Sequence, residues 1–187
     1  MGAVISLRET PIKGVSVIRS TAFVDHRGTF TRMYCARELE GVLGSRQIVQ
    51  CNYSLSNSVG TVRGLHYQRP PHAELKIVRC LRGRVWDIAV DLRAGSPTFL
   101  RWYAAELTPE QSVGLVIPEG CAHGFQILEA DSELLYLHTS CYEPEAEAGV
   151  LHDDPALAIP WPLPIRDVSA RDRQHPPLAQ SFAGIEV

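Results

Sequence analysis

The chain contains the run Gly60-Thr61-Val62-Arg63-Gly64-Leu65-His66-Tyr67-Gln68, and Lys76 opens a strand-like run shortly after it. Three different chemical groups therefore lie within the reach of one short β-hairpin. Arg63 is a cation suited to phosphate, His66 is a base that works near neutral pH, and Lys76 is a donor for an oxyanion. We expect this trio to abstract a proton beside a carbonyl group in a phosphorylated substrate.

Short β-branched or apolar runs, each followed by Gly, Pro, Asn or Asp, recur along the whole chain and predict strands. Many short strands at this spacing predict an antiparallel sandwich or barrel, in which helix is the minority element. The expected strands are Val15–Ile18, Ile48–Ser54, Lys76–Leu81, Val85–Asp91, Ser112–Ile117 and Glu133–Leu137.

The remaining segments predict little regular structure. The best helix candidate is Ala36–Leu43, which ends at Gly44 as helices often do. From about Pro155 the chain is rich in proline, which excludes a regular strand or a long helix there, so we expect this tail to wrap the surface. At 187 residues, the chain is most simply one domain over residues 1–187.

Composition limits the possible partners. The net charge is −3, the isoelectric point is near 6.2, and no block of five or six basic residues occurs, which argues against nucleic-acid binding. A nucleotide-sized ligand remains compatible because local arginines bind phosphate whatever the global charge. No segment has the length and apolarity of a membrane span.

The cysteines indicate the cellular compartment. The chain has five of them, an odd number, with no C-x-x-C pair and no regular spacing. We expect reduced structural thiols in a cytoplasmic protein.

A second motif supports a barrel. Pro118-Glu119-Gly120-Cys121-Ala122-His123 has the P-x-G-x-x-H spacing of the second cupin motif. The first cupin motif begins correctly at Gly60 and His66, but its H-x-H pair is broken by Gln68. One alternative is a metal-dependent cupin enzyme that uses His66, Glu74 and His123 as a 2-His-1-carboxylate ligand set.

The order of several motifs resembles one known family, the dTDP-4-dehydrorhamnose 3,5-epimerases, which are metal-independent members of the cupin superfamily. The resemblance runs from about Val15 to Pro177. It rests on Phe23-x-Asp25-x-Arg27-Gly28-x-Phe30, Gln50-x-Asn52-x-Ser54-x-Ser56, Arg63-Gly64-Leu65-His66-Tyr67-Gln68, Asp87-Ile88-Ala89-Val90-Asp91-Leu92-Arg93, Ile117-Pro118-Glu119-Gly120-x-Ala122-His123-Gly124-Phe125, Tyr136 and Tyr142, Trp161-Pro162, and Ser169-x-x-Asp172.

The resemblance implies a mainly β, cupin-type antiparallel barrel of the jelly-roll kind and a cofactor-free isomerase. Such an enzyme inverts the carbons beside the 4-keto group of a nucleoside-diphosphate 4-keto-6-deoxyhexose, the nucleotide-sugar substrate. Carried over by motif, His66 is the base, Asp172 orients it, Tyr136 is the acid on the other face of the sugar, and Lys76 stabilises the oxyanion.

The resemblance also implies the binding residues and the assembly. Arg27, Gln50, Asn52 and Arg63 match the nucleotide and diphosphate contacts, Tyr142 matches a tyrosine that contacts or stacks on the ligand, and His123 either polarises the sugar or braces the hairpin. The family forms homodimers by exchanging N-terminal strands, which implies that Arg27 reaches the partner's site.

Departures from the family pattern leave alternatives open. Thr29, Arg32 and the pair Glu74-Leu75 differ from the usual residues near the expected ligand rim. An epimerase that inverts only one carbon of a specialised deoxysugar keeps the same catalytic residues. A catalytically inactive sugar-binding module is a further alternative, although His66, Lys76 and Tyr136 together argue against it.

Overall fold

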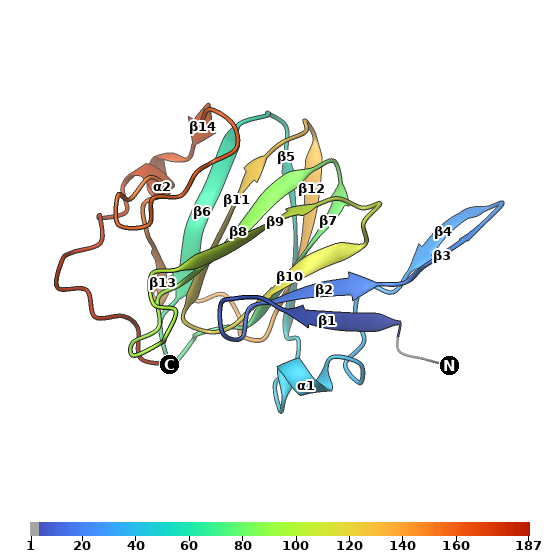
Figure 1. Cartoon of the computed structure of the whole chain (residues 1–187), viewed down its shortest axis with the longest axis horizontal. Coiled ribbons are helices and arrows are strands. Elements are labelled where there is room, and N and C mark those ends of the chain that lie inside the picture. Colours follow the sequence, from blue (N-terminus) through green and yellow to red (C-terminus); the bar gives the residue numbers. More distant parts are fainter. Residues whose placement is uncertain (1–3) are drawn as a thin grey trace.

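The computed structural model describes residues 4–187, and their main feature is a pair of stacked β-sheets (Figure 1). The prediction of a mainly β, antiparallel fold is confirmed. The first sheet has the order β1 (Ile5–Glu9), β2 (Ser16–Ser20), β10 (Val113–Ile117), β7 (Lys76–Arg82), β12 (Ser132–His138), β5 (Gln50–Ser56). The second has the order β13 (Glu147–Gly149), β6 (Thr61–Gln68), β11 (Cys121–Ile127), β8 (Val85–Asp91), β9 (Trp102–Leu107).

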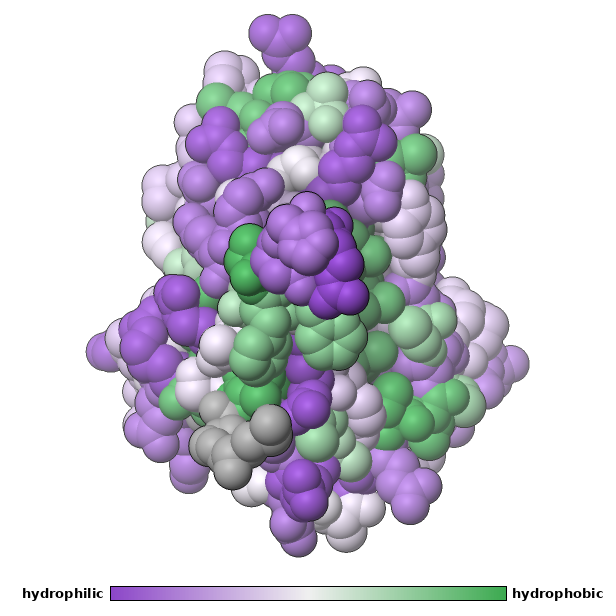
Figure 2. Space-filling model, turned by 90° about the vertical axis from the view of Figure 1, so that its right-hand side faces the viewer, coloured by the Kyte–Doolittle hydropathy of each residue, from purple (hydrophilic) through white to green (hydrophobic). Residues whose placement is uncertain are grey.

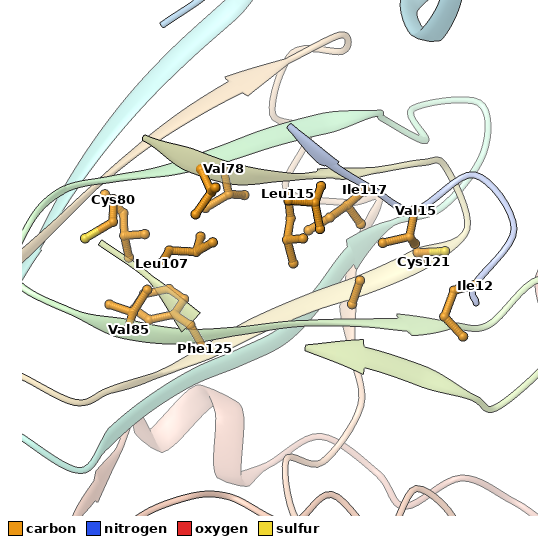
Figure 3. Packing of buried hydrophobic residues seen from close by; sticks show 14 of the residues in the cluster. Ile12, Val15, Val78, Cys80, Val85, Leu107, Leu115, Ile117, Cys121 and Phe125 are labelled. Atoms are coloured by element: carbon orange, nitrogen blue, oxygen red, sulfur yellow. The ribbon is translucent and has the colours of Figure 1, made fainter. Parts of the chain in front are cut away.

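The main hydrophobic core lies between the two sheets (Figure 3). Val78 and Leu115 come from the first sheet, and Val85 and Phe125 come from the second. Alternate side chains of a strand point to opposite faces, so each strand gives every second residue to this core. The inward-facing positions that are polar collect at one end of the sandwich, where they form the site described below.

The outer faces of both sheets are also covered, which explains why a strand such as β11 is buried along its whole length. The N-terminal third of the chain packs on the first sheet, where Leu39 and Leu43 contact Ile77 and Val116. The proline-rich tail packs on the second sheet through Leu157, Ile159, Trp161, Leu178, Phe182 and Ile185.

Two short elements interrupt the tail after its first prolines. Strand β14 (Asp167–Val168) pairs in parallel with β6, and helix α2 (Ala170–Arg173) follows it at once. The Ser169 hydroxyl caps α2 by accepting a hydrogen bond from the Asp172 N–H at 3.0 Å. Asp172 is thereby fixed beside β6.

The predicted helix over Ala36–Leu43 is shorter than expected. Helix α1 spans Glu40–Leu43, and residues 36–39 form turns instead. Its N-cap is Leu39, whose side chain cannot accept a hydrogen bond from the free N–H groups of a first turn. The helix ends at Gly44, as the sequence predicts. Within residues 4–187, no helix is both long and apolar enough to cross a membrane.

A two-stranded hairpin, β3 (Ala22–Asp25) and β4 (Gly28–Thr31), projects away from the sandwich (Figure 1). Its apolar side chains Phe23, Val24 and Phe30 are between 53% and 75% exposed. Viewed towards the hairpin, green hydrophobic surface lies beside and below the hydrophilic group at the centre (Figure 2). The sequence did not predict these two strands.

The contact between β6 and β11 requires glycine. Gly64 has a φ of +113°, and a Cβ atom there would lie 2.6 Å from the Gly124 Cα atom and the His123 carbonyl oxygen. The two glycines therefore let the backbones approach closely just before His66 and just after His123. This approach positions the two histidines on neighbouring strands.

Candidate active site

A pocket of about 620 Å³ opens at the polar end of the sandwich. Both sheets contribute residues to it. Seven of the residues predicted for the site line it, namely Asn52, Arg63, His66, Lys76, His123, Tyr136 and Tyr142.

The candidate base and the candidate acid lie on opposite sheets. His66 on β6 and His123 on β11 are paired residues of the second sheet. Tyr136 on β12 belongs to the first sheet, where Asn52 is its partner on β5. The His123 and Tyr136 rings meet edge to face across the two sheets, with 6.1 Å between their centroids. A sugar ring held in this pocket would thus face His66 from one sheet and Tyr136 from the other.

His66 and Asp172 form a hydrogen-bonded pair, as the sequence predicts. The His66 Nε2 atom lies 2.8 Å from Asp172 Oδ1, and the Gly64 N–H donates to Asp172 Oδ2 at 3.1 Å. Burial alone would raise the pKa of Asp172, but the bonds from His66, Gly64 and Ser169 lower it well below its usual range. Asp172 is therefore ionised near neutral pH, and it leaves the His66 Nδ1 atom available as a base.

Tyr136 is a partly buried phenol at the opposite wall. Its hydroxyl lies 3.0 Å from the Ser54 hydroxyl, and burial raises its pKa. The hydroxyl consequently keeps its proton at neutral pH, as a proton donor must. The ring stacks on His138, with 6.2 Å between the centroids and 20° between the planes.

Lys76 is a buried ammonium with one carboxylate partner. Its Nζ atom lies 3.0 Å from Glu74 Oε1, and the second oxygen, Oε2, lies 2.7 Å from His138 Nδ1. Burial alone would raise the pKa of Glu74, but the bond from His138 and the charge of Lys76 lower it. A carboxylate flanked by two cation-forming groups holds the ammonium in the pocket.

His123 is fixed by a second carboxylate. Its Nε2 atom lies 2.8 Å from Asp87 Oδ2, and both side chains are almost fully buried. Burial lowers the pKa of His123, so its ring is neutral at neutral pH. The geometry agrees with either expected role of His123, since the ring both lines the pocket and braces β11 against β8.

The rim of the pocket carries polar side chains suited to a nucleotide. Gln50 lies just outside the pocket lining, where its Nε2 donates to Asn52 Oδ1 at 3.2 Å and its Oε1 accepts from the Tyr142 N–H at 2.9 Å. Arg63 is exposed and donates to the Leu55 carbonyl at 3.2 Å. A second cation, Arg171, lies at the opening beside His66.

Arg27 is predicted for the site but lies away from the pocket. It lies at the tip of the projecting hairpin, and its side chain is 78% exposed and paired with Asp25 at 2.6 Å. It does not line the pocket of its own chain. Its exposure leaves it available to a partner.

The alternative metal set of His66, Glu74 and His123 does not form. Glu74 is bonded to Lys76 and His138, and His123 is bonded to Asp87. Within residues 4–187, the group of ligand atoms that approach one another within 4.8 Å is His66, Asp172 and His175 instead. The guanidinium of Arg171 is 3.5 Å from His66 Nε2, so a cation already occupies this side of the group.

The sequence did not identify several side chains of the pocket. Ser54, Glu147 and Arg171 line it, as does His138, and Asp87 supports His123. Alternation gives a signal for two of them, because His138 follows Tyr136 by two residues and Ser54 follows Asn52 by two, on the same face of each strand. Arg171 and Glu147 come from separate segments, and no local pattern places them together.

Known proteins resemble the chain over almost its whole length. Residues 9–180 match the family model described as dTDP-4-dehydrorhamnose 3,5-epimerase. The protein of that name from Sinorhizobium fredii is 42% identical over 180 residues, which cover 94% of this chain and 92% of the relative.

Two solved structures of crystallised epimerases share the fold. A Legionella pneumophila dTDP-6-deoxy-D-glucose-3,5-epimerase in complex with dTDP-4-keto-L-rhamnose is 39% identical, with a TM-score of 0.85 over 90% of this chain and 89% of that one. A 3'-monoepimerase from Streptomyces bikiniensis in complex with dTDP-quinovose is 32% identical, with a TM-score of 0.84 over 90% of this chain and 85% of that one. The predicted jelly-roll, cupin-type fold is thereby confirmed.

Proposed function

Since the chain belongs to the dTDP-4-dehydrorhamnose 3,5-epimerase family, we propose that it converts dTDP-4-keto-6-deoxy-D-glucose into dTDP-4-keto-L-rhamnose by inverting carbons 3 and 5. It is an enzyme of the isomerase class. The observation that supports this reaction best is the placement of His66 and Tyr136 on facing sheets of one pocket, which Lys76 at the start of β7 also lines.

The proposed reaction begins with proton removal. The Nδ1 atom of His66 accepts a proton from the carbon beside the keto group. The electron pair of that C–H bond moves into a carbon–carbon double bond. The keto oxygen then carries the negative charge of an enolate, which Lys76 stabilises. A positioned base contributes about 10²–10⁴-fold and an oxyanion donor about 10²–10³-fold to the rate of such reactions.

Inversion is completed on the other face of the sugar. Tyr136 donates its hydroxyl proton to the enolate carbon as the keto group re-forms. Because base and acid approach from different sheets, the new proton arrives on the face of the sugar opposite to the one that the first proton left. Ser54 lies 3.0 Å from the phenol and supplies a route for replacing its proton.

The nucleotide part of the substrate is assigned to the rim. Arg63 faces the diphosphate, and Gln50 and Asn52 read polar groups of the base or ribose. Tyr142 offers a half-exposed ring for stacking, and His123 polarises the sugar from the side of the second sheet.

The proposal includes a homodimer that works in the cytoplasm. The exposed apolar side chains of the β3–β4 hairpin support a partner at that place, since such a patch favours burial against another surface. A partner's Arg27 would then supply a further cation to the rim. The five free cysteines fit a reducing compartment.

The test is proton NMR of dTDP-4-keto-6-deoxy-D-glucose incubated with the protein in deuterated buffer. The proposal predicts deuterium at carbons 3 and 5 and the signals of dTDP-4-keto-L-rhamnose. No exchange at either carbon would refute it.

A single-carbon epimerase is the second candidate. The 32% identity to the Streptomyces bikiniensis 3'-monoepimerase supports it, because the two chains align over 90% of the present one. The same NMR experiment separates the candidates, since deuterium at one carbon alone would establish the single-carbon reaction.

Two variants test the assigned roles. His66→Ala should abolish deuterium exchange at the substrate carbons while nucleotide affinity stays nearly unchanged. Tyr136→Phe should slow product formation more than exchange, because the phenol acts after the proton has left. Equal loss of both steps in Tyr136→Phe would argue against its role as the acid alone.

A further inference from the structure

A continuous series of hydrogen bonds connects the rim of the pocket with the Lys76 ammonium. Gln50 Nε2 lies 3.2 Å from Asn52 Oδ1, and Asn52 Nδ2 lies 3.4 Å from His138 Nε2. The other nitrogen of that ring, Nδ1, lies 2.7 Å from Glu74 Oε2, and Glu74 Oε1 lies 3.0 Å from Lys76 Nζ. We call these five side chains the Gln50–Lys76 chain.

The inner half of the Gln50–Lys76 chain is shielded from water. The side chains of Lys76, Glu74 and His138 are each between 8% and 9% exposed. Hydrogen bonds in such surroundings are stronger and polarise one another more than they do in water. Their arrangement is therefore held by the protein and not by solvent.

The chemistry of the groups gives the whole series a single direction. Glu74 is an ionised carboxylate and can only accept, so both Lys76 Nζ and His138 Nδ1 must donate to it. With a proton on Nδ1, the His138 ring presents Nε2 as an acceptor, and the Asn52 amide N–H₂ donates to it. The Asn52 carbonyl oxygen then accepts from Gln50. Every donor faces an acceptor, with no conflict at any step.

We propose that His138 and Glu74 are positioning residues which hold the Lys76 ammonium in register with the substrate-binding amides Gln50 and Asn52. The proposal rests on the proposed function, in which these amides contact the nucleotide and Lys76 contacts the keto oxygen. A shift of Asn52 on ligand binding reaches Lys76 through two bonded side chains, His138 and Glu74, and a shift of Gln50 reaches it through Asn52 as well. His138 also stacks on Tyr136, so the same chain restrains the ring of the candidate acid.

The positions of the two linking residues explain why they act as a unit. His138 and Lys76 are paired residues of neighbouring strands β12 and β7, and His138 is also paired with Gln50 on β5. Glu74 comes from the segment just before β7 and closes the series from the side. The hydrogen bonds of His138 and Glu74 therefore connect the three adjacent strands β5, β12 and β7 at the inner wall of the pocket.

The substitution Glu74→Gln tests the Gln50–Lys76 chain with almost no change in the shape of the side chain. A Gln side chain accepts from Lys76 through its oxygen, and its N–H₂ must then donate to His138 Nδ1. The ring proton moves to Nε2, where it opposes the Asn52 N–H₂, and the chain breaks. We expect kcat to fall about tenfold with KM changed less than threefold, because the lost positioning acts mainly in the transition state.

The measurement that reports on the Gln50–Lys76 chain directly is the tautomer of His138, observed by ¹⁵N NMR of histidine-labelled protein without substrate. The wild type should carry the proton on Nδ1, and Glu74→Gln should carry it on Nε2. His138→Gln identifies the signal and, should Glu74→Gln fold poorly, provides the second variant, with the same selective fall in kcat expected.

Glu133→Gln is the matched control. It is the same substitution at a residue of β12, which pairs with Arg82 at 3.6 Å and lies outside the pocket. Its kcat and the His138 signal should equal those of the wild type. An Nε2–H tautomer in the wild type, or a Glu74→Gln enzyme with kcat within twofold of the wild type, would overturn the proposal. The tautomer needs no substrate turnover, so it is read even if the epimerase test of the wild type fails.

Discussion

Asp172 accepts two hydrogen bonds with its two oxygens, one from His66 and one from the Gly64 N–H. Asp172→Asn replaces one acceptor oxygen by an N–H₂ group, which then faces one of these donors. We expect kcat to fall about hundredfold or more, because His66 loses the partner that fixes its orientation and proton position. The measurement is the rate of substrate deuterium uptake at saturating substrate.

Asp167→Asn is the control for that experiment, since Asp167 lies in the same tail, is exposed, and pairs with Arg173 at 3.7 Å. It should retain wild-type exchange. If Asp172→Asn also exchanges at the wild-type rate, Asp172 does not orient the base.

Motifs located the residues of the dyad, but the sequence could not supply their contacts. His66 and Asp172 are 106 residues apart, and only the pairing of β14 with β6 brings α2 against the base. The sequence marks Glu74 as an alternative metal ligand and as a departure from the family pattern, and it assigns no role to His138. Their bond depends on the pairing of β12 with β7, which no local pattern reveals.

The close approach of the paired strands β6 and β11 leads to a prediction about these elements. Gly64→Ala adds a Cβ 2.6 Å from backbone atoms of β11 at a φ of +113°, so the two strands must separate. We expect a loss of about 1–3 kcal/mol in the free energy of unfolding, the usual effect of overpacking and of backbone strain. Urea unfolding followed by fluorescence would measure it.

A second glycine provides the comparison. Gly41 lies in α1 with open space around its Cα, so Gly41→Ala should stabilise the protein slightly, by about 0.5–1 kcal/mol. Equal effects of the two substitutions would show that the close approach of β6 and β11 is not needed.

The turn between β8 and β9 depends on Asp91, which is fully buried. Its carboxylate accepts from Arg93, Ser96 and Thr98, and although burial opposes them, these bonds lower its pKa to about 2. A carboxyl whose folded pKa lies below the unfolded value of about 3.9 stabilises the fold above that pH, here by about 2–3 kcal/mol. This contribution disappears as the pH falls from about 4 to 2.

The corresponding experiment compares the wild type with Asp91→Asn. The wild type should be the more stable at pH 6, and the difference in free energy of unfolding should shrink as the pH falls below 4. A difference that is constant between pH 6 and pH 3 would contradict this account of Asp91.

Element by element, the sequence predicts the buried strands best. Strands β7, β8, β10 and β12 are continuous apolar or β-branched runs, and they appear within a residue or two of the expected bounds. Strand β9 was missed because its centre, Ala104-Ala105, has low β propensity, and pairing with β8 determines its conformation. The hairpin β3–β4 was missed because its strands have no core to mark one face.

The whole molecule carries a prediction about subunits. If Arg27 completes the partner's site, a mixed dimer of an Arg27→Ala chain and a His66→Ala chain has one intact site, built from His66 of the first chain and Arg27 of the second. Its activity should be about half that of the wild-type dimer, although each homodimer is impaired. Differently tagged chains allow its purification.

The alternative arrangement gives a different number. If Arg27 acted within its own chain, both sites of the mixed dimer would carry one defect, and activity would not exceed that of the Arg27→Ala homodimer. Size-exclusion chromatography with light scattering establishes that the mixed species is a dimer. A monomeric wild type would contradict the proposed assembly.

The position of Asp172 in the chain has a consequence for biosynthesis. Synthesis proceeds from the N-terminus, and both sheets, including the strands that carry His66, Lys76 and Tyr136, are complete before Asp172 leaves the ribosome. A nascent chain can thus form the pocket and bind nucleotide before its base is oriented. In the proposed mechanism, the base is oriented only after the segment that carries Asp172 has docked on β6.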